Sequence, residues 1–412
     1  MALAAWLVAR RHDGQVTLRI DDIDAERIRP DFDEAISHDL DWLGLDWDVV
    51  VRQSERAVRY AATAERLKQA GRLYPCFESE DELRAKRDRR QRRGDSTIYD
   101  RAMLAMTATQ RAEAEAGGKR PYWRFRLNSG SVQWDDLVLG RQNVKLDAHS
   151  DPVVLRADGT PLPIFAALVD DMDMRITHVI NGTEHVTATG LQLDMLAALG
   201  GRPANLRIGH LPPLDEGARA KRPPTLRSLR TDGVDPAALA GYLSRLGTPE
   251  KPAAEPPSLL ASRYDLGRVA VAPPRFEVAD LLALNRTALN SLPFEAVRDR
   301  LPPAATPAFW LAVRGSLDLL REARGWWEVV GGGFVPALLD DHTAILHQAL
   351  VTLPPEPWDG IALSTWVQSL GDAAELPLRL ALTGEDHGPA LDALLPLIGR
   401  VRVSERLKLA AA

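Results

Sequence analysis

Three carboxylates stand directly after a strand-like segment near the start of the chain. Residues 16–20 alternate apolar and polar side chains, as a half-buried strand does, and Asp21, Asp22 and Asp24 follow them. Parallel α/β sheets bind their ligands at the carboxyl ends of their strands. Asp21 and Asp22 are therefore candidate ligand-binding residues. The competing interpretation is an acidic turn that contacts only solvent.

Basic residues gather in two places, although the formal net charge of the 412-residue chain is −6. Residues 84–93 contain seven bases and one acid, and they include Arg84, Lys86, Arg87 and Arg90. A second group consists of Arg219, Lys221, Arg222, Arg227 and Arg230. Either group alone is compatible with the solvated face of a helix. Two such clusters in an acidic chain favour a polyanionic partner, because local charge matters more than net charge for binding polyanions.

Hydrophobic periodicity predicts the elements that position these residues. A helix begins near Pro30, carries Phe32 and Ile36 in its apolar stripe, and ends at Gly44. A second helix covers residues 57–70. Strands are predicted at 122–127, 131–134 and 176–180, and short helices dominate beyond residue 279. Strands that alternate with helices predict a parallel α/β sheet, with the middle of the chain inserted in it and an all-α unit after it.

Composition limits the class of protein. Hydrophobic residues make up 45% and charged residues 26%, which is typical of a folded, soluble chain of two or three domains. The single cysteine, Cys76, excludes an internal disulfide or a zinc site of clustered thiolates, and it indicates a reducing, cytoplasmic setting. No apolar stretch approaches the roughly 20 residues of a membrane span. We interpret the apolar start, which Arg10 and Arg11 close, as a helix cut out of a larger domain rather than a signal peptide.

Residues 151–200 carry the most specific pattern in the chain. Four groups stand out: Asp151-Pro152-Val153, Arg156-Ala157-Asp158-Gly159, Val169-Asp170-Asp171 and Ile176-Thr177-His178-Val179-Ile180. They closely resemble the second half of the catalytic core of glutamyl-tRNA synthetases, the class I ligases that join glutamate to its tRNA. Residues 19–24 resemble the family's Arg-Ile-Glu-Asp-Thr-Asp motif, and residues 309–315 and 376–389 resemble its anticodon-binding region. The resemblance covers nearly the whole chain.

The resemblance implies a fold of the α/β class. We expect a class I synthetase Rossmann-type nucleotide-binding domain with an α+β insertion, followed by an all-α anticodon-binding domain. The expected limits are 1–73 and 147–205 for the catalytic domain, 74–146 for the acceptor-stem-binding insertion, 206–278 for the signature-loop and stem-contact region, and 279–412 for the anticodon-binding domain. Residues 3–10 resemble the helix that follows the family's His-x-Gly-His motif. A mis-assigned start codon explains the missing motif more simply than a true loss. If the protein starts at Met1, one sheet position is empty, and we expect impaired ATP binding.

The resemblance also implies a reaction and its partners. The family uses ATP and Mg²⁺ to convert glutamate to an adenylate and then transfers the glutamyl group to tRNA. We expect a monomer that binds tRNA through Arg84, Lys86, Arg87, Arg90, Arg227 and Arg230. Histidine invites catalytic interpretations, but His178 fits a structural position in a strand, and His185 has only a modest claim to the pocket.

The resemblance assigns roles at the site. Asp21 or Asp22 would hold the ammonium group of the substrate. Asn181 stands where the family has an arginine that grips the γ-carboxylate of glutamate. Glu184 and Leu214 would contact ATP together with Lys221, which would be the catalytic cation of the signature loop.

The chain departs from the family at some of these positions. Asn181 offers a neutral amide instead of a guanidinium, and Pro163 replaces a tyrosine. Ala220 replaces the signature-loop serine, and Pro223-Pro224 stiffens the end of that loop. Two functional hypotheses follow. The first is an ATP-dependent ligase that charges tRNA with glutamate, and the second is a catalytically impaired, tRNA-binding paralogue.

Overall fold

The computed structural model describes residues 1–24, 30–215, 224–358 and 360–412. The chain divides into two compact units. Unit 1 contains Met1–Asp215, Ser244–Glu250 and Pro257–Phe276, and unit 2 contains Glu216–Leu243, Lys251–Pro256 and Glu277–Ala412. All described strands belong to unit 1, whereas the described part of unit 2 is helical.

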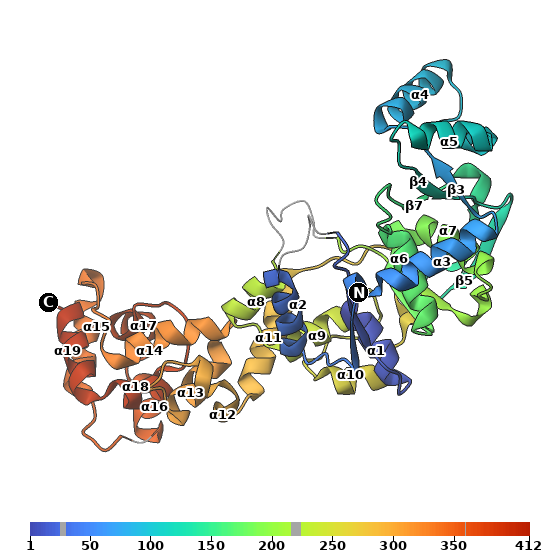
Figure 1. Ribbon diagram of the computed structural model, residues 1–412. Coiled ribbons are helices and arrows are strands. Elements are labelled where there is room, and N and C mark those ends of the chain that lie inside the picture. The colour runs from blue at the N-terminus through green and yellow to red at the C-terminus, as the bar shows by residue number, and fades with distance from the viewer. Residues whose placement is uncertain (25–29, 216–223, 359) are drawn as a thin grey trace. The chain divides into compact units, whose positions relative to one another are not determined.

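Unit 1 contains three small sheets in its described residues (Figure 1). Strands β1 and β2 pair in parallel, β3-β4-β7 form an antiparallel sheet, and β6-β5-β9-β8 form a mixed sheet. The strands are β1 (Thr17–Ile20), β2 (Val49–Arg52), β3 (Leu73–Cys76), β4 (Tyr122–Phe125), β5 (Ser131–Asp136), β6 (Gly140–Lys145), β7 (Val153–Leu155), β8 (His178–Gly182) and β9 (Arg207–Leu211).

Helices surround these sheets. The helices of unit 1 are α1 (Ala2–Arg11), α2 (Pro30–Trp42), α3 (Ala57–Gln69), α4 (Glu80–Arg93), α5 (Ala108–Ala116), α6 (Pro163–Asp173), α7 (Val186–Ala198) and α10 (Pro257–Arg263). α7 connects β8 to the parallel strand β9, as the crossover helix of a βαβ unit does. It also packs against α6. Buried residues such as Phe165, Met195 and Ile208 join these elements in one core.

The strand predicted at 176–180 begins two residues later, at His178, and pairs with β9 in the register Asn181↔His210. Within the described residues β1 pairs only with β2, and β8 pairs only with β9 on its side of the mixed sheet. One edge of β1 and one edge of β8 therefore lack a hydrogen-bonded neighbouring strand there. The hairpin β5–β6, which was predicted to lie in the insertion, joins the sheet of β8 and β9 through the pair Asp136↔Ile208.

The predicted apolar stripe of α2 is not buried as expected. Phe32 is 51% exposed and Ile36 is 47% exposed, although Leu43 just after the helix is buried at 5%. Periodicity identifies the apolar face of a helix but not whether another element covers it. In this case only the end of the face is covered.

Unit 2 confirms the predicted all-α region. Its helices are α8 (Leu226–Asp232), α9 (Pro236–Arg245, whose end lies in unit 1), α11 (Val278–Ser291), α12 (Phe294–Val297), α13 (Pro307–Val313), α14 (Ala323–Gly331), α15 (Thr343–Thr352), α16 (Gly360–Ser369), α17 (Glu375–Thr383), α18 (Leu391–Ile398) and α19 (Arg400–Ala410). Trp310 and Trp366 are 1% and 5% exposed, so both tryptophans belong to the continuous apolar core of this unit. Among the described helices, none is long and apolar enough to cross a membrane.

Candidate active site and nucleic-acid interface

The two neighbouring carboxylates after β1 have different surroundings. Asp22 accepts hydrogen bonds from the Ser54 amide and the Ser54 hydroxyl, each at 2.8 Å, and from Arg52 Nη1 at 3.3 Å. Burial alone would raise the pKa of Asp22, but the hydrogen bonds from Ser54 and Arg52 outweigh it and lower the pKa below its ordinary value. Both oxygens of Asp22 therefore hold the segment after β2 in place.

Asp21 has room for a ligand. Its Oδ1 accepts a hydrogen bond from Arg19 Nε at 3.0 Å, and its side chain is 60% exposed. Its Oδ2 has no hydrogen-bond partner among the described residues. The sequence left Asp21 and Asp22 as alternatives for an ammonium group, and the geometry favours Asp21.

A buried carboxylate that the sequence did not single out joins α6 to α3 and to the segment after β2. Asp170, which is 0% exposed, accepts hydrogen bonds from Gln53 Nε2 at 2.8 Å, Arg56 Nε at 2.6 Å and Tyr60 Oη at 3.0 Å. Burial of the Tyr60 hydroxyl raises its pKa, and the hydrogen bond to the Asp170 carboxylate raises it further. The signal available in the sequence was an acid within an otherwise apolar helix. A carboxylate at such a position is buried, and it therefore requires charged or polar partners from other elements.

Arg19 connects this carboxylate cluster to the candidate ligand-binding residue. Its Nη1 donates to Asp171 Oδ1 at 2.9 Å, while its Nε donates to Asp21. Nε also lies 3.8 Å from Asp170 Oδ2. The orientation of Asp21 therefore depends on two neighbouring acids of α6.

Asn181 and Glu184 lie at the carboxyl end of β8 and just after it. The half-buried side chain of Asn181 makes no hydrogen bond within the described ranges. The Glu184 carboxylate folds over Gly182: a Cβ at Gly182 would lie 2.2 Å from both carboxylate oxygens. His185, which had only a modest claim to the pocket, is 54% exposed, with Nε2 3.6 Å from Glu184 Oε1. The amide of Asn181 is thus available to a ligand, and the Glu184 carboxylate occupies the space that a side chain at position 182 would need.

A buried polar chain supports β8 from the neighbouring strand. His210 is 0% exposed, its Nδ1 lies 2.5 Å from Asp136 Oδ2, and its Nε2 lies 3.0 Å from Thr189 Oγ1. Burial alone would raise the pKa of Asp136, but hydrogen bonds from His210 and three backbone amides lower it to about 2. Because an ionised carboxylate only accepts, Nδ1 of His210 is the donor. This series of hydrogen bonds joins β5, β9 and α7, and His210 is the strand partner of Asn181.

Pro163, which replaces a tyrosine of the family, lies at the start of a helix. It is the first residue of α6, and it is exposed. The first amide of a helix has no intrahelical acceptor, so a proline here loses no helical hydrogen bond and favours the helical φ angle. The absence of a backbone N–H at Pro163 therefore removes no hydrogen bond from the helix.

The expected signature loop is described only at its start. Leu214 is 45% exposed, and the backbone of Asp215 is anchored by hydrogen bonds to Pro274 and Phe276. Residues 216–223, and with them Lys221 and Ala220, lie outside the described residues. The assignment of Lys221 stays a prediction.

The basic side chains of α4 are of two kinds: some are held by neighbouring residues, and others are exposed. Lys86 pairs with Glu78, and Arg90 donates to the Ile98 carbonyl at 3.2 Å and lies 3.7 Å from Asp100. Arg84 is 68% exposed, with Asp81 3.9 Å away, and Arg87 is exposed with no partner among the described residues. A capping box at Ser79 and a left-handed Gly94 define the ends of the helix. Arg84 and Arg87 are free to meet a polyanion, whereas Lys86 and Arg90 also hold the local fold.

A second basic surface lies in unit 2. Arg227 of α8 is exposed, and Arg230 of the same helix lines a cavity of about 830 Å³. Three further arginines line this cavity: Arg300, Arg321 and Arg324. Arg321 pairs with Asp232, and Arg324 lies 3.7 Å from Glu328. The sequence did not associate these three arginines with α8, because they are about 70 to 95 positions away along the chain.

The predicted site residues form two separate groups in the described structure. Asp21 and Asp22 follow a strand of one sheet, whereas Asn181 lies at the end of a strand of another sheet and Glu184 follows that strand. No hydrogen bond or ion pair between described residues joins the two groups directly. They are connected through Arg19 and Asp171, because Asp171 belongs to the helix that precedes β8.

Comparison with known proteins identifies the family. Residues 1–256 match the catalytic domain of class I tRNA synthetases (E and Q). The chain is 51% identical over 422 residues to glutamate–tRNA ligase 2 of Gluconacetobacter diazotrophicus, and the match covers 100% of this chain and 95% of that protein. The chain belongs to the glutamyl-tRNA synthetases of class I. The protein of the same name from Acidiphilium cryptum is 52% identical over 425 residues, with the same coverage.

Solved structures support the fold assignment of this glutamyl-tRNA synthetase family member. The glutamate–tRNA ligase of Elizabethkingia meningosepticum superimposes with a TM-score of 0.83 at 21% identity. The glutamate–tRNA synthetase of Elizabethkingia anophelis gives the same values. In both cases the match covers 100% of this chain and 95% of the other. The predicted class I synthetase fold with a helical carboxyl-terminal region is confirmed.

Proposed function

We propose that this protein ligates glutamate to tRNA at the expense of ATP, through a glutamyl-adenylate. The observation that carries the proposal is the identity of 51–52%, along the whole chain, with two glutamate–tRNA ligases. The amino-acid carboxylate attacks the α-phosphorus of ATP, and pyrophosphate leaves. A terminal hydroxyl of tRNA then attacks the acyl carbon, and AMP leaves.

The free oxygen of Asp21 supports its role in binding the ammonium group. Arg19 holds the other oxygen and fixes the direction of the carboxylate. The unpaired amide of Asn181 would donate a neutral hydrogen bond to the side-chain carboxylate of glutamate. Neutral hydrogen bonds are weaker than those of a guanidinium, so we propose that the bound amino acid is held less tightly than by an arginine.

ATP would contact Glu184, Leu214 and Lys221, in line with the family motif. Among the described residues, no group of three or more His, Cys, Asp or Glu side chains could hold a metal ion. These residues therefore do not form a protein cage for Mg²⁺. An ion that arrives with ATP would be bound mainly by phosphate oxygens and water, as Mg²⁺ commonly is.

Two basic surfaces support tRNA binding. Arg84 and Arg87 of α4 are exposed, and Arg227 and Arg230 of α8 lie on or beside the arginine-lined cavity of unit 2. We also propose a cytoplasmic monomer, which suits the single cysteine, a buried free thiol.

ATP–pyrophosphate exchange tests the proposed activity. With glutamate and tRNA present, the protein should catalyse the exchange. The variant Asp21→Asn should raise the KM for glutamate about 10- to 100-fold, because it replaces the charged acceptor of the ammonium group with a neutral amide. Asp13→Asn, an identical change at an exposed acid, is the control. Absence of exchange from a folded protein that binds tRNA would reject the ligase and support the impaired paralogue.

A further inference from the structure

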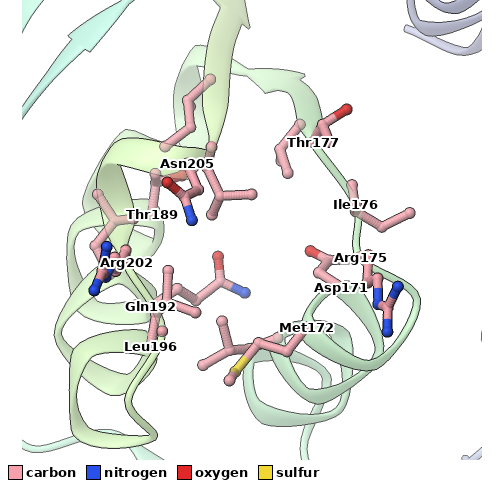
Figure 2. A pocket seen from close by; sticks show the side chains of 16 residues that line it. Asp171, Met172, Arg175, Ile176, Thr177, Thr189, Gln192, Leu196, Arg202 and Asn205 are labelled. Carbon is pink, nitrogen blue, oxygen red and sulfur yellow. The ribbon is translucent and has the colours of Figure 1, made fainter. Parts of the chain in front are cut away.

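A cavity of about 340 Å³ lies between α6 and α7 (Figure 2). Its walls are mainly apolar and come from both helices and from β8 and β9. The apolar lining residues are Leu168, Met172, Ile176, Val179, Leu193, Leu196, Leu206 and Ile208. Cavities that bind small molecules usually have volumes of about 300–1,000 Å³, apolar walls and a few convergent polar groups.

The cavity lies at the opposite end of β8 from Asn181. Ile176 and Thr177, which line it, precede β8, and Leu206 directly precedes β9. At about 3.3 Å per residue, the four steps from Thr177 to Asn181 span roughly 13 Å, and the two steps from Val179, which also lines the cavity, span roughly 7 Å. Asn181, Glu184 and Leu214 do not line the cavity. The cavity does border Asp171, which is paired with the same Arg19 that holds Asp21.

Polar groups, two of which are neutral amides, line this cavity. Figure 2 shows Gln192 and Asp171 directed into it from opposite sides. The Gln192 amide donates through Nε2 to the Ile164 carbonyl at 3.1 Å, and its oxygen has no partner in the described part of the chain. The exposed Asn205 side chain also lines the cavity and makes no hydrogen bond there. These amides can orient a ligand without favouring either sign of charge.

The charged lining favours an anion. Arg175 and Arg202 are exposed, line the cavity, and have neither a hydrogen bond nor an ion pair among the described residues. The single acid of the lining, Asp171, is already paired with Arg19 at 2.9 Å. The uncompensated charge at the cavity is therefore positive, which attracts anions and repels cations.

From these features we infer that the cavity between α6 and α7 binds a small organic anion with an apolar body. The body would occupy the space between Met172 and Leu196, and its carboxylate, sulfonate or phosphate would meet Arg175 or Arg202. Glutamate and ATP do not match these walls, because neither has a predominantly apolar body. The site does not depend on the activity proposed above.

A matched pair of fluorescent probes tests the inference on the full chain. The probes are 8-anilinonaphthalene-1-sulfonate, an anion, and N-phenyl-1-naphthylamine, a neutral analogue of nearly the same shape. The anion should bind saturably and more tightly than the neutral probe. Arg175→Gln/Arg202→Gln should weaken binding of the anion roughly threefold to tenfold and leave the neutral probe unchanged. Arg59→Gln/Arg141→Gln, which removes two exposed arginines elsewhere, should change neither affinity.

Two further measurements locate the probe. Met172→Trp should fill the cavity and abolish binding, with circular dichroism to confirm folding. In the unchanged protein, the ¹³C-methyl NMR signal of Met172 should shift on saturation with the anion, whereas those of Met103 and Met106 should not. Equal affinities for the two probes, displacement of the anion by glutamate or ATP, or an unshifted Met172 signal would each overturn the inference.

Discussion

At the scale of single residues, chemically identical side chains receive different roles from their surroundings. Asp21 and Asp22 are adjacent carboxylates, but Asp22 is occupied by Ser54 and Arg52, whereas one oxygen of Asp21 is free among the described residues. A carboxylate whose lone pairs are already used cannot bind a substrate ammonium without losing those hydrogen bonds. Asp22 therefore supports the site, and Asp21 is the residue that can contact a ligand.

The neutral side chain at 181 gives a prediction at the same scale. Asn181→Arg should lower the KM for glutamate about fivefold, because a hydrogen bond to a charged donor is worth about 1 kcal/mol more than one to a neutral amide. The measurement is the glutamate dependence of ATP–pyrophosphate exchange. Asn143→Arg, the same change at an exposed position of β6, is the control. An unchanged or higher KM for Asn181→Arg would show that residue 181 does not face the glutamate side chain.

At the scale of elements, buried polar side chains determine how strands and helices are joined. The chain Asp136–His210–Thr189 links β5, β9 and α7, and Asp170 links α6 to α3 and the segment after β2. Such networks stabilise one arrangement of the elements, because any other arrangement leaves a buried charge unpaired. They hold the neighbours of the strands that position Asn181 and Asp21, because β9 pairs with β8 and β2 pairs with β1.

The lowered pKa of Asp136 makes this linkage dependent on pH. A carboxyl with a folded-state pKa of about 2 and an ordinary value of 3.8 stabilises the folded state above about pH 4, and this contribution is lost as the pH falls through 2. Asp136→Asn should therefore lower the free energy of unfolding by about 2 kcal/mol more at pH 6 than at pH 2. Denaturant unfolding at both pH values measures this.

Asp135→Asn is the matched control, since Asp135 is the exposed neighbour on the same strand. It should show a small effect with little difference between the two pH values. If Asp136→Asn destabilises the protein equally at pH 6 and pH 2, the Asp136 carboxylate is not the source of this stability.

At the scale of the whole molecule, cations are concentrated in two surfaces although the net charge is −6. One surface is the exposed side of α4 in unit 1, and the other is the arginine-lined cavity of unit 2. Polyanion affinity follows the number of phosphates that local cations neutralise, not the total charge. Each surface by itself therefore has the local positive charge that a polyanion requires.

Binding of tRNA at several salt concentrations tests this division. Arg84→Gln/Arg87→Gln and Arg300→Gln/Arg324→Gln should each reduce the slope of log affinity against log salt by about 2, one unit per lost phosphate contact. The control Arg59→Gln/Arg141→Gln removes the same charge from other exposed positions and should leave the slope unchanged. A slope that falls equally in all three double variants would indicate an effect of net charge alone.

The sequence by itself determined the family, the α/β class and most local elements. Alternating residues predicted β1 within one residue, and the motif around Val169-Asp170-Asp171 identified relatives that the comparisons confirmed. These features depend on neighbours along the chain, so periodicity and motif order report them directly. The expected apolar stripe of α2 was the exception, because burial depends on what covers a helix.

Only the tertiary structure decided which site residues have free atoms. Asp170 meets Gln53 across 117 positions, His210 meets Asp136 across 74, and Asp22 meets Ser54 across 32. No periodicity in the sequence encodes these pairings, because they arise when separate elements pack and buried polar groups find partners. The carboxylates after β1 were visible in the sequence from the outset. In the folded protein, both oxygens of Asp22 are hydrogen-bonded to Ser54 and Arg52, whereas one oxygen of Asp21 has no partner among the described residues and can accept a ligand.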